Sequence, residues 1–312
     1  MFLISAIGVG DLGGPGTRRM GTPLSVRGTQ GRRLDSLNQL MRRVALGSLS
    51  IVFFLLPALA FAQADWDSAP RFREADDAYM ERADPVRATF ANARYEALYR
   101  ADPTDWEAGW RVAMTCYYLG GRVAKEKPEK EALFARGRDV ALASLESNPD
   151  CAPCHLLAGI NMALYAETVG VVKMIFTLVD IRSHLRRSLD LDPGFSEAAA
   201  ARILAVIDEK VPFFLGGSKK RARANFERAV EIDPGEPLNY LFYARFLEKR
   251  REFKAALVLA QRGLALPRPG PERVESRGAW DRLTTLEPEL RERLERRPDP
   301  FTRQRPGQKR RR

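Results

Sequence analysis

Five short segments that end in proline recur along the chain and restrict its fold more than any other sequence feature. They are ADP ending at Pro103, SNP at Pro149, LDP at Pro193, IDP at Pro234 and LALP at Pro267. Successive prolines are 46, 44, 41 and 33 residues apart. The segments between them have helical apolar spacing and few β-branched runs, so each proline closes a helical unit. The sequence predicts an all-α fold.

The last unit shows most clearly how the helices pair. Ala222, Phe226 and Ala229 precede Pro234 at the spacing of a tetratricopeptide repeat, whose period is about 34 residues. Two amphipathic segments follow, and their apolar faces contain Tyr240, Tyr243, Ala244 and Leu247 in the first and Phe253, Ala256, Leu257, Ala260 and Leu264 in the second. We therefore expect a tetratricopeptide-like α-solenoid of stacked helix pairs over residues 63–290.

The earlier units are longer than the tetratricopeptide period, so we expect insertions between their paired helices. In one of them, Trp106, Trp110, Val112, Ala113 and Tyr117 mark the first helix, and 133–145 the second. The most unusual insertion is 166–179, in which Lys173 is the only charge after Glu167. It either fills the solenoid core or lines a pocket for an apolar ligand, and burial is favoured because a helix that is apolar all round is normally buried.

Residues 41–62 have the composition of a secretory signal peptide. Met41-Arg42-Arg43 is basic, no charge follows from Val44 to Ala64, and Ala60-Phe61-Ala62 is a small-x-small cleavage pattern. A transmembrane anchor is the alternative, but Pro57 and the alanines before Gln63 favour cleavage between Ala62 and Gln63. We expect a periplasmic protein, with residues 1–40 a mis-assigned, disordered leader.

The net charge of +11 is concentrated outside the predicted helical body. Residues 1–62 carry +5 and residues 291–312 carry +7, which leaves −1 for residues 63–290. A nucleic-acid-binding domain carries its basic surface on the fold, so we do not expect nucleic acid as a partner. The tail 291–312 should be disordered, either solvated or touching anionic lipid head groups.

Two segments make the chain resemble a known family. They are GVVKMIFTLVDIRSHLRRSLDLDP at 170–193 and VPFFLGGSKKRARANFERAVEIDP at 211–234. Over roughly residues 90–266 the chain resembles the TatT family, the T component associated with periplasmic TRAP transporters, and Leu215-Gly216-Gly217-Ser218 is the most specific part. It is more weakly similar to the eukaryotic regulator of microtubule dynamics family, which shares the repeat layout.

The TatT resemblance implies a helical-repeat body with an internal cleft or pore, homo-oligomerisation, and docking to a TRAP solute-binding subunit that carries small organic acids. This chain lacks the lipid-anchoring cysteine of some members, since its first cysteine is Cys116. We expect a ligand or partner groove lined by apolar side chains from several units: Trp106, Trp110, Tyr117, Met174, Phe176, Phe213, Phe214, Tyr240 and Tyr243.

The segment Cys151-Ala152-Pro153-Cys154-His155 is the attachment motif of c-type haem. Two thioethers would hold the porphyrin and His155 would ligate the iron, with Met162, Met174 or His184 as the sixth ligand. The alternatives are a Cys151–Cys154 disulfide, which an oxidising compartment permits, and simple packing at the start of a helix. Cys116 is most simply a small buried hydrophobe.

Catalytic signatures are missing from the sequence. It contains no H-E-x-x-H or G-x-S-x-G motif, and only two histidines. We therefore expect a non-enzymatic binding protein, a TRAP-associated accessory component. The alternatives are a haem-carrying electron-transfer protein and a general protein-interaction scaffold.

Overall fold

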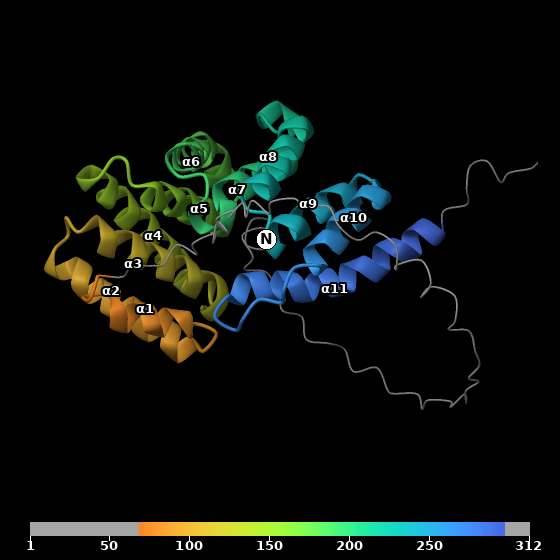
Figure 1. Ribbon diagram of the computed structural model, residues 1–312. Coiled ribbons are helices and arrows are strands. Elements are labelled where there is room, and N and C mark those ends of the chain that lie inside the picture. Colours follow the sequence, from red (N-terminus) through yellow and green to blue (C-terminus); the bar gives the residue numbers. More distant parts are fainter. Residues whose placement is uncertain (1–68, 297–312) are drawn as a thin grey trace, which may run out of the picture. The chain divides into compact units, whose positions relative to one another are not determined.

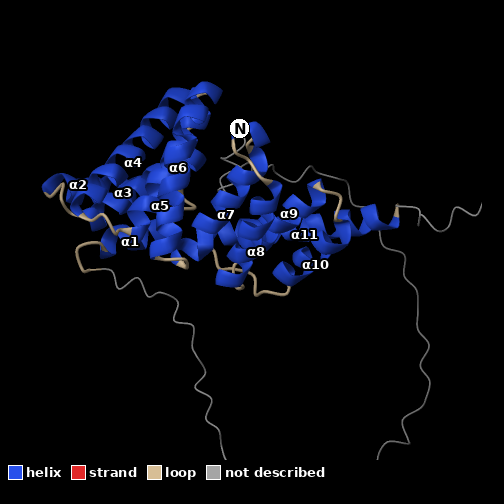
Figure 2. Cartoon of the chain, turned by 90° about the horizontal axis from the view of Figure 1, so that it is seen from above, coloured by secondary structure: helices blue, strands red, loops and turns tan. Residues whose placement is uncertain are grey.

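A computed structural model describes residues 69–296 of the chain (Figure 1). The predicted leader, the signal peptide and its cleavage site at Ala62 and Gln63 lie outside the described residues, as does the tail after residue 296. Every regular element in the described range is helical, and Figure 2 shows no strand there. The predicted all-α solenoid of helix pairs is confirmed.

The described range contains eleven α-helices, one π-helical turn and one 3-10 turn. In chain order they are α1 (Arg73–Met80), α2 (Pro85–Ala101), α3 (Trp106–Tyr118), η1 (Leu119–Val123), α4 (Lys127–Ser147), α5 (Ala152–Val169), α6 (Val171–Leu191), α7 (Phe195–Lys210), η2 (Phe213–Leu215), α8 (Lys219–Ile232), α9 (Pro237–Lys249), α10 (Phe253–Leu264) and α11 (Val274–Glu295).

Four helices end at the residue that precedes a proline. These C-cap residues are extended, with φ of −142° at Asp102, −140° at Asn148, −145° at Asp192 and −130° at Asp233. A residue before proline is driven out of the helical region by the proline ring. Each cap side chain also accepts from the backbone N–H two residues later, at 2.8–3.2 Å. The motif thus stops the helix and forms the turn that follows.

The helices pack as consecutive pairs, α3 with α4, α5 with α6, α7 with α8 and α9 with α10. The first helices of the pairs also contact one another in the order α3, α5, α7, α9, so they form one face of the solenoid. The second helices α4 and α6 have 21 residues each, against 14 in α8 and 12 in α10. The extra length of the early units therefore lies mainly in longer helices rather than in the predicted insertions between helices.

The last two pairs are built as their sequence predicts. Ala222, Phe226 and Ala229 are buried on α8. The Phe226 ring lies 5.8 Å from the Tyr243 ring and 5.3 Å from the Phe246 ring, centroid to centroid. Ala256 and Ala260 are buried on α10, where small side chains allow close approach of the helices.

The apolar segment 166–179 is not buried as a unit. Gly170, with φ of +141°, separates α5 from α6, a conformation that favours glycine. After this break, α6 turns one face to solvent: Val172, Phe176 and Val179 are 69%, 79% and 76% exposed. Leu178 is buried and Met174 packs partly against the core. The favoured burial of the whole segment is therefore wrong, because α6 has neighbours on one side only.

The helical body extends beyond its predicted end at residue 290. Helix α11 continues to Glu295, and Leu283, Leu286 and Leu290 are fully buried along it. These leucines follow helical spacing and pack against α9 and α10. The first residues of the predicted tail are thus the last turn of a capping helix.

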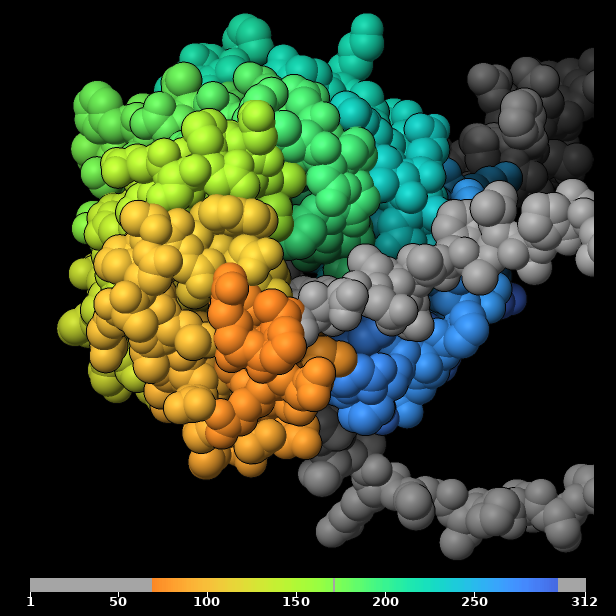
Figure 3. All heavy atoms as spheres, turned by 60° about the vertical axis from the view of Figure 1, so that its left-hand side comes forward, coloured from red at the N-terminus to blue at the C-terminus, as the bar shows by residue number. Residues whose placement is uncertain are grey.

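One arginine joins the two ends of the solenoid. Arg82, just after α1, donates from its Nη1 to the Glu272 carbonyl oxygen (2.8 Å) and from its Nη2 to Glu275 Oε2 (2.6 Å). The side chains of Arg82 and Glu275 are largely buried, with 10% and 17% of their surface exposed. Figure 3 shows the N-terminal helices (orange) directly beside the start of α11 (blue). Helix α11 therefore closes the row of helix pairs back onto α1.

We predict that Arg82→Ala destabilises the protein by about 3–5 kcal/mol, because it leaves the Glu275 carboxylate buried without its hydrogen-bonded ion-pair partner. Urea denaturation followed by circular dichroism measures this. The matched control is Arg100→Ala, which removes a 73%-exposed guanidinium 3.6 Å from Glu96 and should cost less than about 1 kcal/mol. Arg82→Met with Glu275→Leu should recover most of the loss. Equal losses in Arg82→Ala and in the control would contradict the closing role.

Candidate partner-binding site

Ionisable side chains from distant parts of the chain meet where the first helices face α11. They come from the turn after α1, from η1, from α7, from the N-cap of α9, and from α11 and its N-cap. We call this group the inner charged cluster, and its members are Arg82, Arg122, Glu197, Arg202, Glu236, Arg273, Glu275 and Arg282.

Glu236 is the most enclosed member, with no exposed surface. As the N-cap of α9 it accepts from the Leu238 N–H (2.8 Å) through Oε1. Its Oε2 accepts from Arg273 and from the Ser276 hydroxyl, both at 2.8 Å. Burial and the nearby Glu197 raise the pKa of Glu236 to about 7. This carboxyl therefore changes charge near neutral pH.

Arg202 lies beside an unusual turn at the start of α7. Ser196, Glu197 and Ala198 have φ of 52°, 54° and 61°, a left-handed conformation that is costly for residues with a Cβ. The turn aims the Glu197 carbonyl oxygen at Arg202 Nη1 (3.0 Å), which also donates to Asn239 Oδ1 (2.6 Å). Burial lowers the pKa of Arg202, and the neighbouring Glu236 and Glu197 oppose this shift.

Two arginines of the cluster repel each other. Burial, and then the like charges of Arg122 and Arg245, lower the pKa of Arg282. Arg122 also interacts with Glu275. Burial raises the pKa of the Glu275 carboxyl, but the charges of Arg82 and Arg122 together hold this pKa below its usual value. The cluster contains five arginines and three glutamates, so it carries a surplus of positive charge when all are ionised. It suits a ligand or peptide that carries carboxylates.

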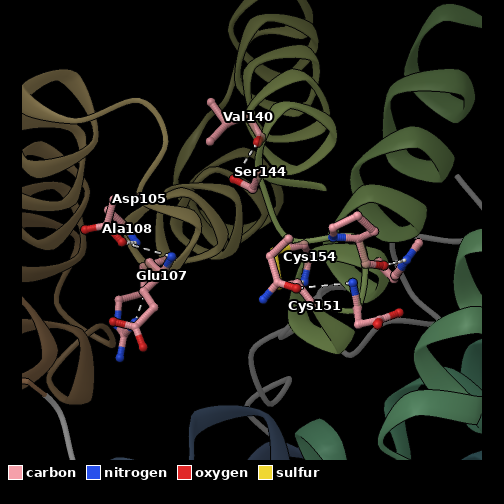
Figure 4. Close-up of a disulfide and its surroundings, with 12 residues drawn as sticks. Asp105, Glu107, Ala108, Val140, Ser144, Cys151 and Cys154 are labelled. Carbon is pink, nitrogen blue, oxygen red and sulfur yellow. Dashed lines mark hydrogen bonds between the residues drawn. A yellow bond between two sulfur atoms is a disulfide. The ribbon is translucent and has the colours of Figure 1, made fainter. Parts of the chain in front are cut away.

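The C-x-x-C-H segment forms the start of α5 (Figure 4). Cys151, the N-cap, is bonded to Cys154 in a disulfide, and both side chains are buried. A sulfur in a disulfide has no thiol to add to a haem vinyl group. His155 Nδ1 lies 2.9 Å from His184 Nδ1, and His155 Nε2 lies 3.0 Å from the Pro149 carbonyl oxygen. Both ring nitrogens of the expected iron ligand thus have protein partners.

The nine residues of the predicted groove do not line one surface. Four of them are buried in the helix-pair core: Trp110, Tyr117, Tyr240 and Tyr243. Trp106 and Met174 are half-buried, whereas Phe176, Phe213 and Phe214 are exposed. The correction has a simple cause, because large residues at repeat positions fill the space between paired helices.

Sequence reasoning missed the inner charged cluster. Its members are spread over 200 residues, from Arg82 to Arg282, and follow no motif. One local signal exists: Arg202 is the single charge in AAAARILAVI at 198–207, and a buried arginine requires partners. The partners themselves are defined only by how α7, α9 and α11 pack.

Other kinds of site are not found in the described range. Among residues 69–296, no group of three or more histidine, cysteine, aspartate or glutamate side chains could hold a metal ion. None of the described helices combines the length and apolar composition needed to cross a bilayer.

Comparison with known proteins identifies the architecture. The family model for regulator of microtubule dynamics protein 1-3 matches residues 72–200, which is less than half of the chain. A crystal structure of a thermophilic TPR protein from Thermus thermophilus matches with a TM-score of 0.50 and 14% identity, covering 69% of this chain and 99% of that one. No curated protein matches the chain. The chain therefore has a tetratricopeptide-like helical-repeat fold.

We predict that one cysteine of the three reacts with an alkylating agent in denaturant without reductant, and three after reduction. The single reactive residue should be Cys116. It should not react in the native protein, because burial raises its pKa to about 12 and thiolate is the reactive form. Peptide mass spectrometry measures the sites. A Soret band that survives denaturation, together with unreactive Cys151 and Cys154, would instead indicate covalent haem.

We predict that the histidine pair contributes less to stability as the pH drops through the histidine range. Burial lowers the pKa of both His155 and His184. At His155 the hydrogen bond to the Pro149 carbonyl oxygen and the charge of Asp150 oppose this shift, and Arg187 adds to it. At His184 the charge of His155 adds to the shift and Asp180 opposes it. The unfolded chain, with a histidine pKa of about 6.5, therefore binds protons more readily than the folded chain. This stabilisation is complete above the unfolded pKa and is lost as the pH falls below it.

Urea midpoints at pH 7.5 and 5.5 measure the effect as a difference between two proteins. On acidification the wild type should lose stability relative to a His155→Gln/His184→Gln variant. Glu236 and Glu197, with their raised pKa values, contribute with the opposite sign, but they are common to both proteins. An identical change in the two proteins would show that the histidine pair has no such effect.

Proposed function

We propose that this protein is a non-enzymatic tetratricopeptide-type scaffold that binds a carboxylate-bearing partner against the inner charged cluster. The observation that carries the proposal is the position of Arg282 on α11, where it is half-buried, donates from Nε to the Gly278 carbonyl oxygen (3.1 Å) and lies near the like charges of Arg122 and Arg245. Holding this charge there opposes folding. An anionic group that binds beside the Arg282 guanidinium offsets that cost.

The fold supports a binding role. Stacked helix pairs present a continuous face made by α3, α5, α7 and α9, which is the usual recognition surface of such repeats. Arginine is well suited to this face because its planar guanidinium binds a carboxylate with two parallel hydrogen bonds. A peptide rich in aspartate or glutamate and a small organic acid share this chemistry.

The finer proposal is a periplasmic accessory component of a TRAP-type transporter that docks a solute-binding subunit. It is supported by the signal-like segment 41–62, by the resemblance of residues 90–266 to the TatT family, and by the match between arginines and organic acids. A haem-dependent electron carrier is less well supported, since its motif cysteines are bonded to each other. A general scaffold with another acidic partner is the remaining alternative.

We predict that Arg282→Gln lowers partner recovery by about tenfold, which corresponds to about 1.4 kcal/mol, without lowering thermal stability. Stability should be unchanged or higher, because the substitution removes charge repulsion from a binding site. Crosslinking in the cell envelope followed by mass spectrometry measures recovery. The matched control is Arg291→Gln, which removes a 57%-exposed guanidinium from the same helix α11.

Three outcomes separate the alternatives. Recovery of a TRAP solute-binding subunit that depends on Arg282 supports the transporter role. Recovery of another acidic protein with the same dependence supports the general scaffold and removes the transporter link. Equal recovery by the cluster variant and by Arg291→Gln would remove the inner charged cluster from the binding site.

A further inference from the structure

An exposed apolar surface lies on the side of the solenoid where α6 and the turn between α7 and α8 meet. We call it the apolar patch. Its members and exposed fractions are Val172 (69%), Ile175 (41%), Phe176 (79%), Val179 (76%), Phe213 (88%) and Phe214 (78%). None belongs to the inner charged cluster. Large apolar side chains that are exposed on neighbouring elements indicate a site of interaction.

The α6 part of the patch is a stripe along one side of the helix. Residues 172, 175, 176 and 179 follow the i, i+3, i+4, i+7 pattern. One turn further, Arg182 continues the stripe, and its Nη2 donates to the Gly216 carbonyl oxygen at 3.0 Å. Helices α6 and α7 are also direct neighbours (Figures 1 and 2). The stripe therefore leads to the turn that carries Phe213 and Phe214.

The turn is held rigidly although its two phenylalanines face solvent. Its backbone N–H groups at Gly216, Gly217 and Ser218 donate to the carbonyl oxygens of Phe213 (2.9 Å), Pro212 (3.0 Å) and Asp208 (3.0 Å). Gly216 has φ of +83°, and a Cβ on Gly217 would lie 1.8 Å from the Val211 carbonyl oxygen. Only glycine fits this turn at both positions.

Side chains add a second layer of support. Asp208, nearly buried, accepts from Arg182 and from Arg221, both at 2.9 Å. The two arginines thus join α6, α7 and α8 behind the turn. Because the turn is fixed in this way, the exposure of Phe213 and Phe214 is a built feature and not the result of a loose loop.

Cations surround the turn. Lys210 and Lys219 lie on either side of it, and Lys249 and Arg250 are brought next to them at the end of α9. Glu209, Lys219, Lys249, Arg250 and Phe246 line an open depression of about 400 Å³. Two carboxylates lie among these cations: Glu209 pairs with Lys249 at 2.8 Å, and Glu252 pairs with Arg250 at 3.0 Å. Burial, and then Lys249, lower the pKa of Lys210, so the cations are close enough to repel one another.

We propose that the apolar patch and this basic rim dock the protein onto the surface of an anionic phospholipid bilayer. Phe213, Phe214 and the α6 stripe enter the interface between head groups and acyl chains, while Lys210, Lys219, Lys249 and Arg250 contact lipid phosphates. Protruding aromatic side chains next to lysine are typical of interfacial membrane binding. The positive rim gives the preference for anionic lipid.

The proposal does not depend on the function of the inner charged cluster. The patch is formed by α6 and η2, whereas the cluster is formed by the turn after α1, η1, α7, the N-cap of α9 and α11. Substitutions in one surface therefore leave the residues of the other unchanged, and failure of either proposal can be recognised separately.

Vesicle sedimentation tests the proposal, with the purified full chain and with vesicles of phosphatidylcholine alone or mixed with phosphatidylglycerol. Wild-type protein should bind the mixed vesicles, and Phe213→Ser/Phe214→Ser should weaken binding by about tenfold or more. The matched control is Val258→Ser, since Val258 is 55% exposed on α10, away from the patch. All variants contain the same basic tail, so any contribution of the tail to vesicle binding is the same in each of them.

The basic rim is tested in the same assay. Lys210→Gln/Lys249→Gln should reduce binding to the mixed vesicles and reduce its dependence on salt. Lys125→Gln/Lys127→Gln changes the net charge equally near the start of α4 and should have a much smaller effect. If both pairs reduce binding equally, the attraction is a property of net charge, and the rim has no specific role.

A direct readout is the fluorescence of an environment-sensitive dye on Phe214→Cys. Mixed vesicles should shift its emission to the blue, whereas a dye on Val258→Cys should not shift. Native Cys116 does not interfere, because it is buried. The proposal would be overturned if the dye at residue 214 shows no shift. It would also be overturned if the protein binds no vesicles and Phe213→Ser/Phe214→Ser loses a self-associated species, which would assign the patch to a second copy of the chain.

Discussion

A residue that precedes proline cannot easily remain helical, and the architecture of this protein depends on that constraint. Asp102, Asn148, Asp192 and Asp233 each end a helix in an extended conformation and use the side chain to form the next turn. The chain must therefore reverse direction at each of these positions. The apolar face of every helix then has a neighbouring helix to pack against, and the result is a row of antiparallel pairs.

A row of helix pairs has two open ends, and here α11 joins them. The Arg82–Glu275 ion pair brings residues almost 200 positions apart into contact. Closure also places α11 opposite the first helices, so that Glu236, Arg273 and Ser276 can form one hydrogen-bonded group. The inner charged cluster is a consequence of this closure, because none of the helix pairs could assemble it alone.

The sequence was sufficient to predict features that depend on the local spacing of residues. It was insufficient for features that depend on which helices pack against one another. Proline positions and apolar periodicity predicted the pairs α3–α4 and α9–α10 and the buried positions of Ala222, Phe226 and Ala229. The same periodicity led to errors: Trp110, Tyr117, Tyr240 and Tyr243 were expected in a groove, but they fill the core. A large aromatic residue has the same pattern in a groove and in a helix interface, and only the packing distinguishes them. The extra length of the early units was also assigned wrongly to insertions. Longer helices and inserted loops add residues to a repeat in the same way, so spacing alone does not distinguish them.

The two candidate surfaces have opposite chemistry but share one physical property. In the inner charged cluster, Arg282 is held half-buried near the like charges of Arg122 and Arg245. On the outer side, a turn that only glycine can form holds Phe213 and Phe214 in water. Neither arrangement lowers the free energy of the isolated chain. Both use rigid helical elements to keep an unfavourable group in a fixed position, which reduces the entropy lost when a complementary group binds. The proposed acidic partner and the proposed lipid surface contact different residues, so the two proposals are compatible, and the rigid solenoid would fix the separation of the two ligands.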